Sequence, residues 1–501
     1  MNPPPLVVDR PKTHEHPLTL LPREVSFTCN ACGTKGERSP YVCLLCCFMI
    51  HEDCIELPRV IRTNRHPHRL SHIFSFGSEK KSDCRICGEG IDGRYGAYSC
   101  LIPSISYNVH SRCATRTDAW DGKELEGVPD DETLPDPFKV TSKDKIIHFS
   151  HEEHELRRIT SDYNDNDAHC CACNLRVYPN PFYKCDEVNC GFTLHQTCAN
   201  LPRETRIPIH PYPLTLIYKV DNSIFKCASC NHFSNGFRYS SSKYDFNLDT
   251  KCASITEPSL AGDGHHHSLY SNSKYTSCCG CDQTEATPLS CPDCELGLCY
   301  VCATLPSRIP YGDDAHPLSL NHGGILFSQK NYWCDSCETQ VDPLKKFYMC
   351  STSCGTVVHT KCAIGGHLRN LKAGLGFNID RYKCEVVLNN QVTRPCCSQC
   401  KLRSQGLLLL KICSGGVEAF ISYLCSIECV QKHGLIDNMD IDPRQQPVIN
   451  DTFYGSFRSP QQMATSYSAS TRTTTTTLST ATTTTTTNKY RPTTNDYKTN
   501  M

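Results

Sequence analysis

The sequence predicts a tandem array of small, metal-dominated modules followed by a disordered C-terminal tail. The chain of 501 residues carries 38 cysteines and 22 histidines, far more of both than an average protein. One cysteine and histidine pattern recurs at intervals of roughly fifty residues. Hydrophobic content is modest, at 39%.

Cysteines in this number serve either disulfides or metal ions. The N-terminal "MNPPPLVVDR" lacks the apolar stretch of a secretory signal, and no stretch reaches the about 18 apolar residues of a membrane span. We therefore expect a chain of the cytoplasm or nucleus, where thiols stay reduced or bind metal. The parallel enrichment in histidine favours metal, because disulfides have no use for imidazole. The net charge of -1 gives no global attraction to nucleic acid or anionic membranes.

Internal repeats define the domain organisation. The phrase C-x-x-L-P recurs, as in "CIELP" (54–58) and "CATLP" (302–306), and histidine-rich phrases such as "HEHPL" (14–18) open the blocks. Most blocks then run through C-x-x-C, aromatic-x-C, a further Cys and H-x-x-C. The predicted parts are modules 1 to 6 at 14–58, 66–116, 148–202, 210–255, 265–306 and 316–364, an acidic linker at 117–147, a cysteine cluster at 384–433 and a threonine-rich tail at 440–501. The acids and prolines of the linker indicate flexibility, and the tail has almost nothing to bury.

The spacing of these residues is typical of zinc, which takes four cysteine or histidine ligands in a tetrahedron. Modules 1 and 3 each offer eight ligands in the same order, hence two sites. They are His14, His16, Cys29, Cys32, Cys43, Cys46, His51 and Cys54, and then His151, His154, Cys170, Cys173, Cys185, Cys190, His195 and Cys198.

Two pairings of these ligands are compatible with the spacing. Neighbouring pairs could share a zinc, or the first C-x-x-C could join H-x-x-C while the leading histidines join the middle cysteines. Module 4 favours the interleaved pairing, because its losses are correlated. Ser241 and Tyr244 fill its middle positions and only His210 remains in front, whereas Cys227, Cys230 and Cys252 persist. Asp249 stands in place of the last histidine, and we expect it to hold a weakened zinc beside an empty second site.

Metal should decide whether each module folds. Ordering the chain costs about 1–2 kcal/mol per residue, which the burial of a small core roughly offsets. A structural zinc contributes about 10–16 kcal/mol at neutral pH. Aromatic residues beside the cysteines, such as Phe182 and Trp333, are expected to form the small cores that shield the thiolates.

The other modules vary the same pattern. In module 2 Ile105 replaces one middle cysteine, in module 5 Cys299 replaces the last histidine, and in module 6 the front phrase offers His316, with His322 as a weaker candidate. Four cysteines beside the ligands, at 47, 171, 279 and 396, are predicted not to bind metal.

The candidate ligands are His66, His68, Cys84, Cys87, Cys100, His110 and Cys113 in module 2; His265, His267, Cys278, Cys281, Cys291, Cys294, Cys299 and Cys302 in module 5; His316, Cys334, Cys337, Cys350, Cys354, His359 and Cys362 in module 6; and Cys397, Cys400, Cys425 and Cys429, with His433 as a substitute, in the last cluster. At four ligands per site this amounts to about ten zinc ions.

With these motifs, the chain resembles the plant cysteine/histidine-rich proteins of the "divergent C-one" class, relatives of the diacylglycerol finger of protein kinase C. The carrying motifs are the H-x-H-x-L opener, F-x-C-x-x-C, Y-x-C and C-x-F-x-L-H-x-x-C, over roughly residues 14–364. The resemblance implies a small β-sheet plus a short helix around two interleaved zincs. It also implies roles in signalling, stress or hormone responses, with proteins as partners.

Diacylglycerol binding is doubtful. The lipid-binding relatives shape their groove with a Gln-Gly pair, and neither "GTKGERSPYV" (33–42) nor "DQTEATPLS" (282–290) contains one.

The expected function is therefore a non-catalytic, zinc-binding scaffold for proteins. Three alternatives remain: a thiol-disulfide enzyme, since "YWCDSC" (332–337) is similar to the thioredoxin motif; a ubiquitin ligase or chromatin reader with interleaved zincs; and a nucleic-acid binder. The last would use Arg59, Arg62, Arg65 and Arg69, a run that also fits a solvated linker.

Overall fold

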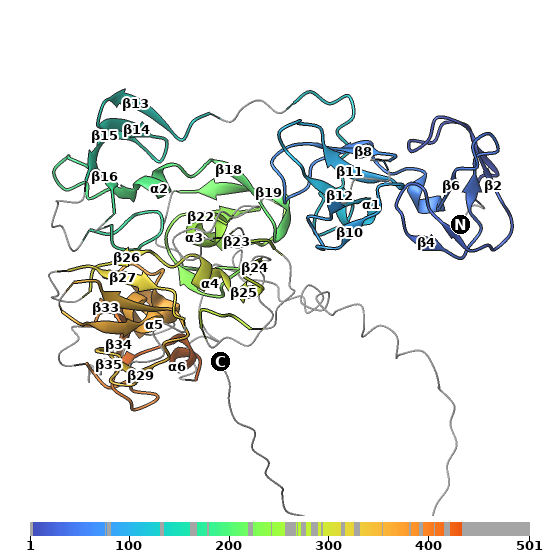
Figure 1. Ribbon diagram of the computed structural model, residues 1–501. Coiled ribbons are helices and arrows are strands. Elements are labelled where there is room, and N and C mark those ends of the chain that lie inside the picture. The colour runs from blue at the N-terminus through green and yellow to red at the C-terminus, as the bar shows by residue number, and fades with distance from the viewer. Residues whose placement is uncertain are drawn as a thin grey trace, which may run out of the picture. The chain divides into compact units, whose positions relative to one another are not determined.

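A computed structural model gives the fold (Figure 1). It describes residues 4–432 apart from 76, 78–81, 131–134, 161–167, 178–179, 219–223, 242, 256–266, 268, 272–276, 282–288, 292–293, 312–315, 325–330, 353, 380–381, 390–393, 405 and 415–420. The predicted threonine-rich tail, His265 and His433 lie outside these residues.

Modules 1, 2, 4 and 6 share one topology. Two strands, a separate two-stranded hairpin and two further strands follow in sequence, and the outer four form one antiparallel sheet. In module 1 they are β1 (Val7–Val8), β2 (Leu18–Leu20), β3 (Phe27–Thr28), β4 (Lys35–Gly36), β5 (Tyr41–Val42) and β6 (Met49–Ile50), then the 3-10 helix η1 (Glu52–Cys54). In module 2 they are β7 (Val60–Ile61), β8 (Leu70–Ile73), β9 (Ser82–Asp83), β10 (Gly90–Ile91), β11 (Ala97–Cys100) and β12 (Asn108–His110), then helix α1 (Ser111–Ala114).

Modules 4 and 6 repeat this order. Module 4 contains β18 (Glu204–Ile207), β19 (His210–Ile217), β20 (Phe225–Lys226), β21 (Phe233–Ser234), β22 (Arg238–Ser240), β23 (Asn247–Asp249) and α3 (Thr250–Ala253). Module 6 contains β26 (Arg308–Ile309), β27 (Leu318–Asn321), β28 (Tyr332–Trp333), β29 (Gln340–Val341), β30 (Phe347–Cys350), β31 (Val357–His359) and α5 (Thr360–Ile364).

The remaining parts are variants of the same plan. Module 3 has a five-stranded sheet of β13 (Phe138–Ser142), β14 (Lys145–His148), β15 (His151–Ile159), β16 (Phe182–Cys185) and β17 (Thr193–His195), then α2 (Gln196–Ala199). The described part of module 5 has β24 (Leu289–Cys291), β25 (Leu296–Leu298) and α4 (Tyr300–Ala303). After η3 (Gly366–Leu368), the last cluster forms a four-stranded sheet of β32 (Gly376–Ile379), β33 (Tyr382–Leu388), β34 (Leu408–Ser414) and β35 (Ile421–Leu424), then α6 (Ile427–Lys432). The predicted small sheets with one short helix are confirmed.

A buried tyrosine ties each of modules 2, 4 and 6 to the chain that precedes it. The hydroxyl of Tyr98 donates to the carbonyl of Pro58 at 2.5 Å, that of Tyr239 to Pro202 at 2.7 Å, and that of Tyr348 to Pro306 at 2.7 Å. These prolines end the repeated C-x-x-L-P phrases. The residues just after them form β7, β18 and β26, so each sheet begins a few residues before the predicted module start.

Replacing Tyr98 with phenylalanine should destabilise module 2 by about 1–3 kcal/mol, because it leaves the carbonyl of Pro58 buried without a donor. Hydrogen exchange at β11 measures this loss. Tyr95→Phe is the matched control, since its ring is only partly buried. Equal exchange rates in both variants would show that the hydrogen bond from Tyr98 to Pro58 does not stabilise module 2.

The segment 117–147, predicted as a flexible linker, is structured at both ends. Phe138–Ser142 and Lys145–His148 are strands of the module 3 sheet. Near the other end, Glu124 pairs with Lys12 at 2.6 Å, and two further acids pair with the basic run: Glu126 with Arg59 at 3.2 Å and Asp130 with Arg69 at 2.9 Å. The sequence showed the acids and the arginines separately, and only the fold brings them together.

Trp333 also differs from expectation. The sequence predicts that it shields thiolates, but 62% of the residue is exposed on the short β28–β29 hairpin. Phe182, in contrast, is buried as predicted. Among the described residues, no helix has the length and apolar character needed to cross a bilayer.

Candidate metal centres

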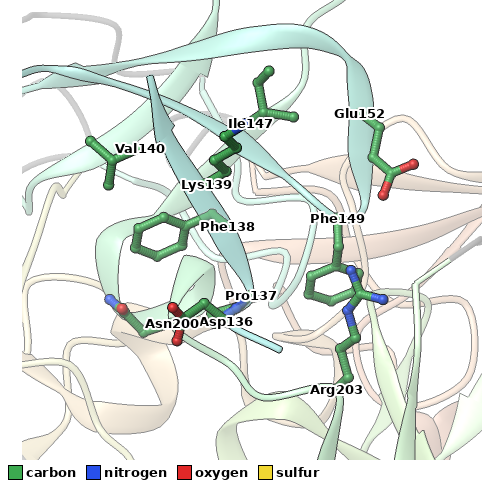
Figure 2. Close-up of a pocket in the computed structure, with 10 residues that line it drawn as sticks. All are labelled: Asp136, Pro137, Phe138, Lys139, Val140, Ile147, Phe149, Glu152, Asn200 and Arg203. Carbon is green, nitrogen blue, oxygen red and sulfur yellow. The ribbon is translucent and has the colours of Figure 1, made fainter. Parts of the chain in front are cut away.

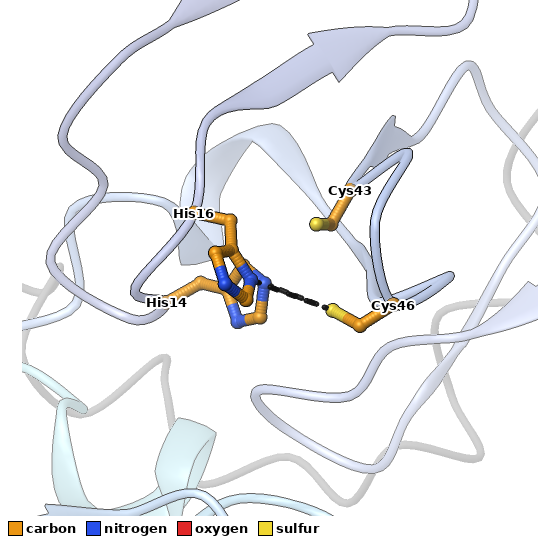
Figure 3. A group of neighbouring side chains, drawn as sticks. All are labelled: His14, His16, Cys43 and Cys46. Atoms are coloured by element: carbon orange, nitrogen blue, oxygen red, sulfur yellow. Dashed lines mark hydrogen bonds between the residues drawn. The ribbon is translucent and has the colours of Figure 1, made fainter.

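Module 1 contains two separate groups of four ligands. Cys29, Cys32, His51 and Cys54 place their ligand atoms within 4.8 Å of one another, and so do His14, His16, Cys43 and Cys46. Figure 3 shows the second group, in which His14 Nε2 lies 3.2 Å from Cys46 Sγ. The first C-x-x-C thus joins H-x-x-C, and the leading histidines join the middle cysteines. The interleaved pairing is confirmed.

Module 3 repeats both groups, and module 2 repeats the first. The groups are Cys170, Cys173, His195 and Cys198; His151, His154, Cys185 and Cys190; and Cys84, Cys87, His110 and Cys113. All four members of the first of these groups are buried. Such depth is typical of a structural site, in which protein ligands fill every position.

Local backbone geometry explains why these residues converge. The first C-x-x-C pair of a module lies on a tight turn. The residue four positions after the first cysteine donates its N–H to the carbonyl of that cysteine: Gly33 to Cys29, Asn174 to Cys170 and Glu338 to Cys334, each at 2.8 Å. These donors have positive φ, which suits glycine and asparagine. We call this C-x-x-C turn the knuckle of a module. The last histidine and cysteine lie three residues apart, at the start of the short helix, and face the knuckle.

The electrostatics of the groups favour a bound cation. Hydrogen bonds with Cys84 and Cys87 raise the pKa of His110 to about 10. Burial alone would lower the pKa of His195, but the thiolates of Cys173 and Cys170 raise it to about 10. Clustered thiolates therefore create a strongly negative potential, and zinc is the divalent ion that suits mixed sulfur and imidazole ligands. The residues present fit zinc.

Modules 5 and 6 bring most of their predicted ligands together. His267 Nδ1 lies 2.8 Å from Cys294 Sγ, whose N–H donates to Cys291 Sγ, and Cys281 and Cys299 lie 3.9 Å apart by their sulfurs. Cys278 Sγ accepts from the N–H of Cys299, and Cys299 Sγ accepts from the N–H of Cys302, so these four cysteines correspond to the first group of module 1. In module 6, His316 Nδ1 lies 3.0 Å from Cys354 Sγ, itself 3.2 Å from Cys350. The knuckle of Cys334 and Cys337 meets His359 and Cys362. His322 instead lies 3.5 Å from the ammonium of Lys346.

The last cluster is all cysteine in its described part. Cys425 Sγ lies 3.6 Å from that of Cys400 and 3.7 Å from that of Cys429. The buried Cys397 completes the set through its knuckle.

The second group of module 2 keeps its histidines without a fourth ligand. The rings of His66 and His68 lie 5.1 Å apart, as do those of His151 and His154, and those of His14 and His16 lie 5.2 Å apart. His66 is buried, yet neither of its ring nitrogens has a hydrogen-bond partner among the residues that the structure describes. A buried polar atom without a hydrogen-bond partner destabilises the fold, and a bound metal ion would provide that partner. The arrangement of His66 and His68 is therefore still that of a metal centre.

Replacing Ile105 with cysteine should therefore add one zinc, because it restores the fourth ligand beside His66, His68 and Cys100. Native mass spectrometry of the full chain counts the ions. Ile105→Ser is the control, since a hydroxyl is a poor zinc ligand. An unchanged count in Ile105→Cys would show that the group no longer accepts metal.

Module 4 places Asp249 within its first group. Its Oδ2 accepts from the thiol of Cys230 at 3.2 Å and from Nδ2 of Asn370 at 3.3 Å. Its Oδ1 accepts from the N–H of Cys252 at 2.8 Å and so caps α3. Burial, and next the charge of Cys227, raises the pKa of Asp249 to about 7. The carboxyl occupies the position of the missing histidine.

The second group of module 4 is replaced by an aromatic cluster. His210 Nδ1 lies 3.0 Å from the carbonyl oxygen of Tyr212, and its ring packs on Phe246 and Tyr244. Ser241 accepts from the N–H of Lys243. These side chains have local partners, in agreement with the expected loss of this site.

The role of one residue in the C-x-F-x-L-H-x-x-C motif was not predicted from the sequence. A ring packs against the first leading histidine in four modules, with centroids 4.0–4.4 Å apart: Phe48 on His14, Tyr107 on His66, Phe192 on His151 and Phe246 on His210. Each lies three residues before the last histidine or Asp249. That fixed spacing is the signal that would have found them.

A separate hollow of about 760 Å³ lies on β13 and β14 (Figure 2). Phe138 and Phe149 line it, and the guanidinium of Arg203 lies 4.7 Å from the ring centre of Phe149. None of the residues that line it is a cysteine or histidine. It shares no ligand with the metal centres.

Comparison with protein families gives two matches. The sequence model of the C1 domain matches residues 12–55, 64–114, 149–199, 208–253 and 313–363, and that of the C-terminal C1 domain-like region matches 384–430. Together they cover more than half of the chain. Module 5 lies outside these ranges, although its described cysteines follow the same pattern. No curated protein and no solved structure matches the chain.

Proposed function

Because the chain belongs to the C1 domain family of cysteine-rich, zinc-binding proteins, we propose that it is a non-catalytic scaffold. Its tandem modules would present surfaces to several protein partners in intracellular signalling or a stress response. The bound zincs supply cross-links between strands and helix, and the protein's own side chains supply the recognition surfaces.

The observation that carries this proposal is the closure of the metal groups. In modules 1 and 3 four protein ligands surround each position, so no coordination site remains for the water or substrate that catalytic zinc needs. The thiols of Cys334 and Cys337 lie against His359, as metal ligands would, which argues against a thioredoxin-like role.

The basic run offers little to nucleic acid. Arg59 and Arg69 pair with acids of the 117–130 segment, and Arg65 pairs with Asp118 at 3.4 Å and donates to the carbonyl of Ser271. An arginine that already holds an acid is less available to neutralise a phosphate.

Affinity capture with the full chain tests the proposal. We expect specific proteins to bind the zinc-loaded chain and to be lost from a chain with serine at Cys173 and Cys337. Insulin reduction and autoubiquitination assays run beside it. Turnover in either assay, dependent on zinc loading, would replace the scaffold by an enzyme.

A further inference from the structure

The knuckle of module 1 is covered by module 2. The N–H of Gly96 donates to the carbonyl of Asn30 at 2.7 Å, and the hydroxyl of Ser111 donates to the carbonyl of Ala31 at 2.8 Å. His72 Nε2 lies 3.0 Å from the same carbonyl oxygen. Ala31 and Ser111 are fully buried. These contacts join residues far apart in sequence through the main chain between Cys29 and Cys32.

The same surfaces meet in modules 3 and 4. The N–H of Phe237 donates to the carbonyl of Ala172 at 2.9 Å, and the hydroxyl of Thr250 reaches that oxygen at 3.4 Å. Ala172 is the third residue of its knuckle, as Ala31 is. Thr250 opens α3, as Ser111 opens α1. The donors therefore come from equivalent positions of the two even-numbered modules.

Glycine is required at this contact. A Cβ at Gly96 would lie 2.6 Å from the oxygen of Ala31, and one at Gly236 would lie 2.3 Å from the oxygen of Ala172. Both distances are shorter than real Cβ contacts allow, and the obstacle is backbone in each case. Neither glycine has positive φ, so close approach between modules is the reason for both.

Modules 5 and 6 meet at the equivalent place with a different residue. Lys346 precedes the buried Tyr348 by two positions, as Gly96 precedes Tyr98 and Phe237 precedes Tyr239. Its side chain is buried against the knuckle of module 5, where a Cβ at Gly280 would lie 3.1 Å from its Cδ. The neighbouring Lys345 donates to the carbonyl of Cys281 at 3.5 Å.

From this threefold repetition we propose that the knuckle of each odd-numbered module is a docking site for the following module. Modules 1 and 2, 3 and 4, and 5 and 6 then form two-module units, and zinc retention by the first member depends on docking of the second. The proposal goes beyond the scaffold function, since it concerns which modules act together whatever they bind. It requires that undocking opens the odd-numbered zinc site and leaves the other pairs unchanged.

Site-resolved alkylation of the full, zinc-loaded chain tests it. Iodoacetamide labels cysteines that have released zinc to a mild chelator, and peptide mass spectrometry reports each cysteine separately. In Gly96→Val we expect Cys29 and Cys32 to be labelled about tenfold faster, because undocking removes buried hydrogen bonds. Cys170 and Cys173 should keep their wild-type rates. Gly236→Val should show the reverse.

Two further variants decide between docking and general damage. Gly90→Val is the matched control, because the nearest atom to a Cβ there is 3.9 Å away within the same module. It should leave Cys29 and Cys32 at the wild-type rate. Ser111→Ala removes one donor without adding bulk, and should speed labelling of Cys29 and Cys32 about threefold. Wild-type labelling of these cysteines in Ser111→Ala, whatever Gly96→Val does, overturns the proposal, and so does equal acceleration in Gly90→Val.

Discussion

Serine at Cys173 is expected to release one zinc and to unfold module 3, whereas serine at the neighbouring Cys171 should leave both unchanged. Cys173 lies in the buried group with Cys170, His195 and Cys198. Cys171 is outside that group, and burial raises the pKa of its thiol, which keeps it protonated. A structural zinc contributes about 10–16 kcal/mol, more than the whole stability of a typical domain.

Native mass spectrometry of the full chain gives the zinc count, and hydrogen exchange at β16 and β17 reports the fold of module 3. The two substitutions are chemically identical and adjacent, so any difference between them reflects metal ligation. Equal zinc counts in the two variants would show that Cys173 is not a ligand.

Alanine at Asp249 is expected to empty the single metal site of module 4 and to expose α3 to exchange. The substitution removes a ligand and also the cap that accepts from Cys252, which alone contributes about 0.5–2 kcal/mol. Residues that only hydrogen-bond to a metal ligand typically cost about 10–100-fold in metal affinity when they are replaced. Loss of a ligand itself should therefore weaken zinc binding by at least that factor. Labelling of Cys227, Cys230 and Cys252 measures the release.

Asn and His at the same position separate the two roles of the aspartate. Asp249→Asn keeps an oxygen that caps the helix, but its neutral amide is a weaker ligand, so the zinc should still be lost while α3 persists. Asp249→His restores the ligand found in modules 1, 2, 3 and 6 and should tighten the site. Wild-type labelling rates in Asp249→Ala would reduce the aspartate to a capping residue.

The metal groups were predictable from sequence because zinc imposes local rules. Two cysteines on one turn, or a histidine and a cysteine at the start of a helix, are fixed by a few residues of chain. Even the pairing of distant groups was predictable, because module 4 has lost one leading histidine together with both middle cysteines, whose positions hold Ser241 and Tyr244.

The contacts between modules were not predictable in the same way. The contact of a module with a knuckle uses main-chain carbonyls, which every residue has. The only residue types in the sequence that indicate it are the glycines at 96 and 236. The pairing of Glu124 and Glu126 with Lys12 and Arg59 depends on a chain reversal that neither charge run reveals. The first strands of the sheets in modules 1, 2 and 6 were missed because two residues, such as Val60–Ile61, are too short to show a period.

The hydrogen bond from the buried tyrosine to the proline before its module determines which stretch of sequence can fold as one duplicated module. A copy of module 2 that began at the leading histidines would lack β7 and the carbonyl of Pro58 that Tyr98 needs. A gene duplication that yields a folded extra module must therefore carry the end of the module before it. The same limit applies in the laboratory, where an expressed fragment of module 2 should start no later than Leu57.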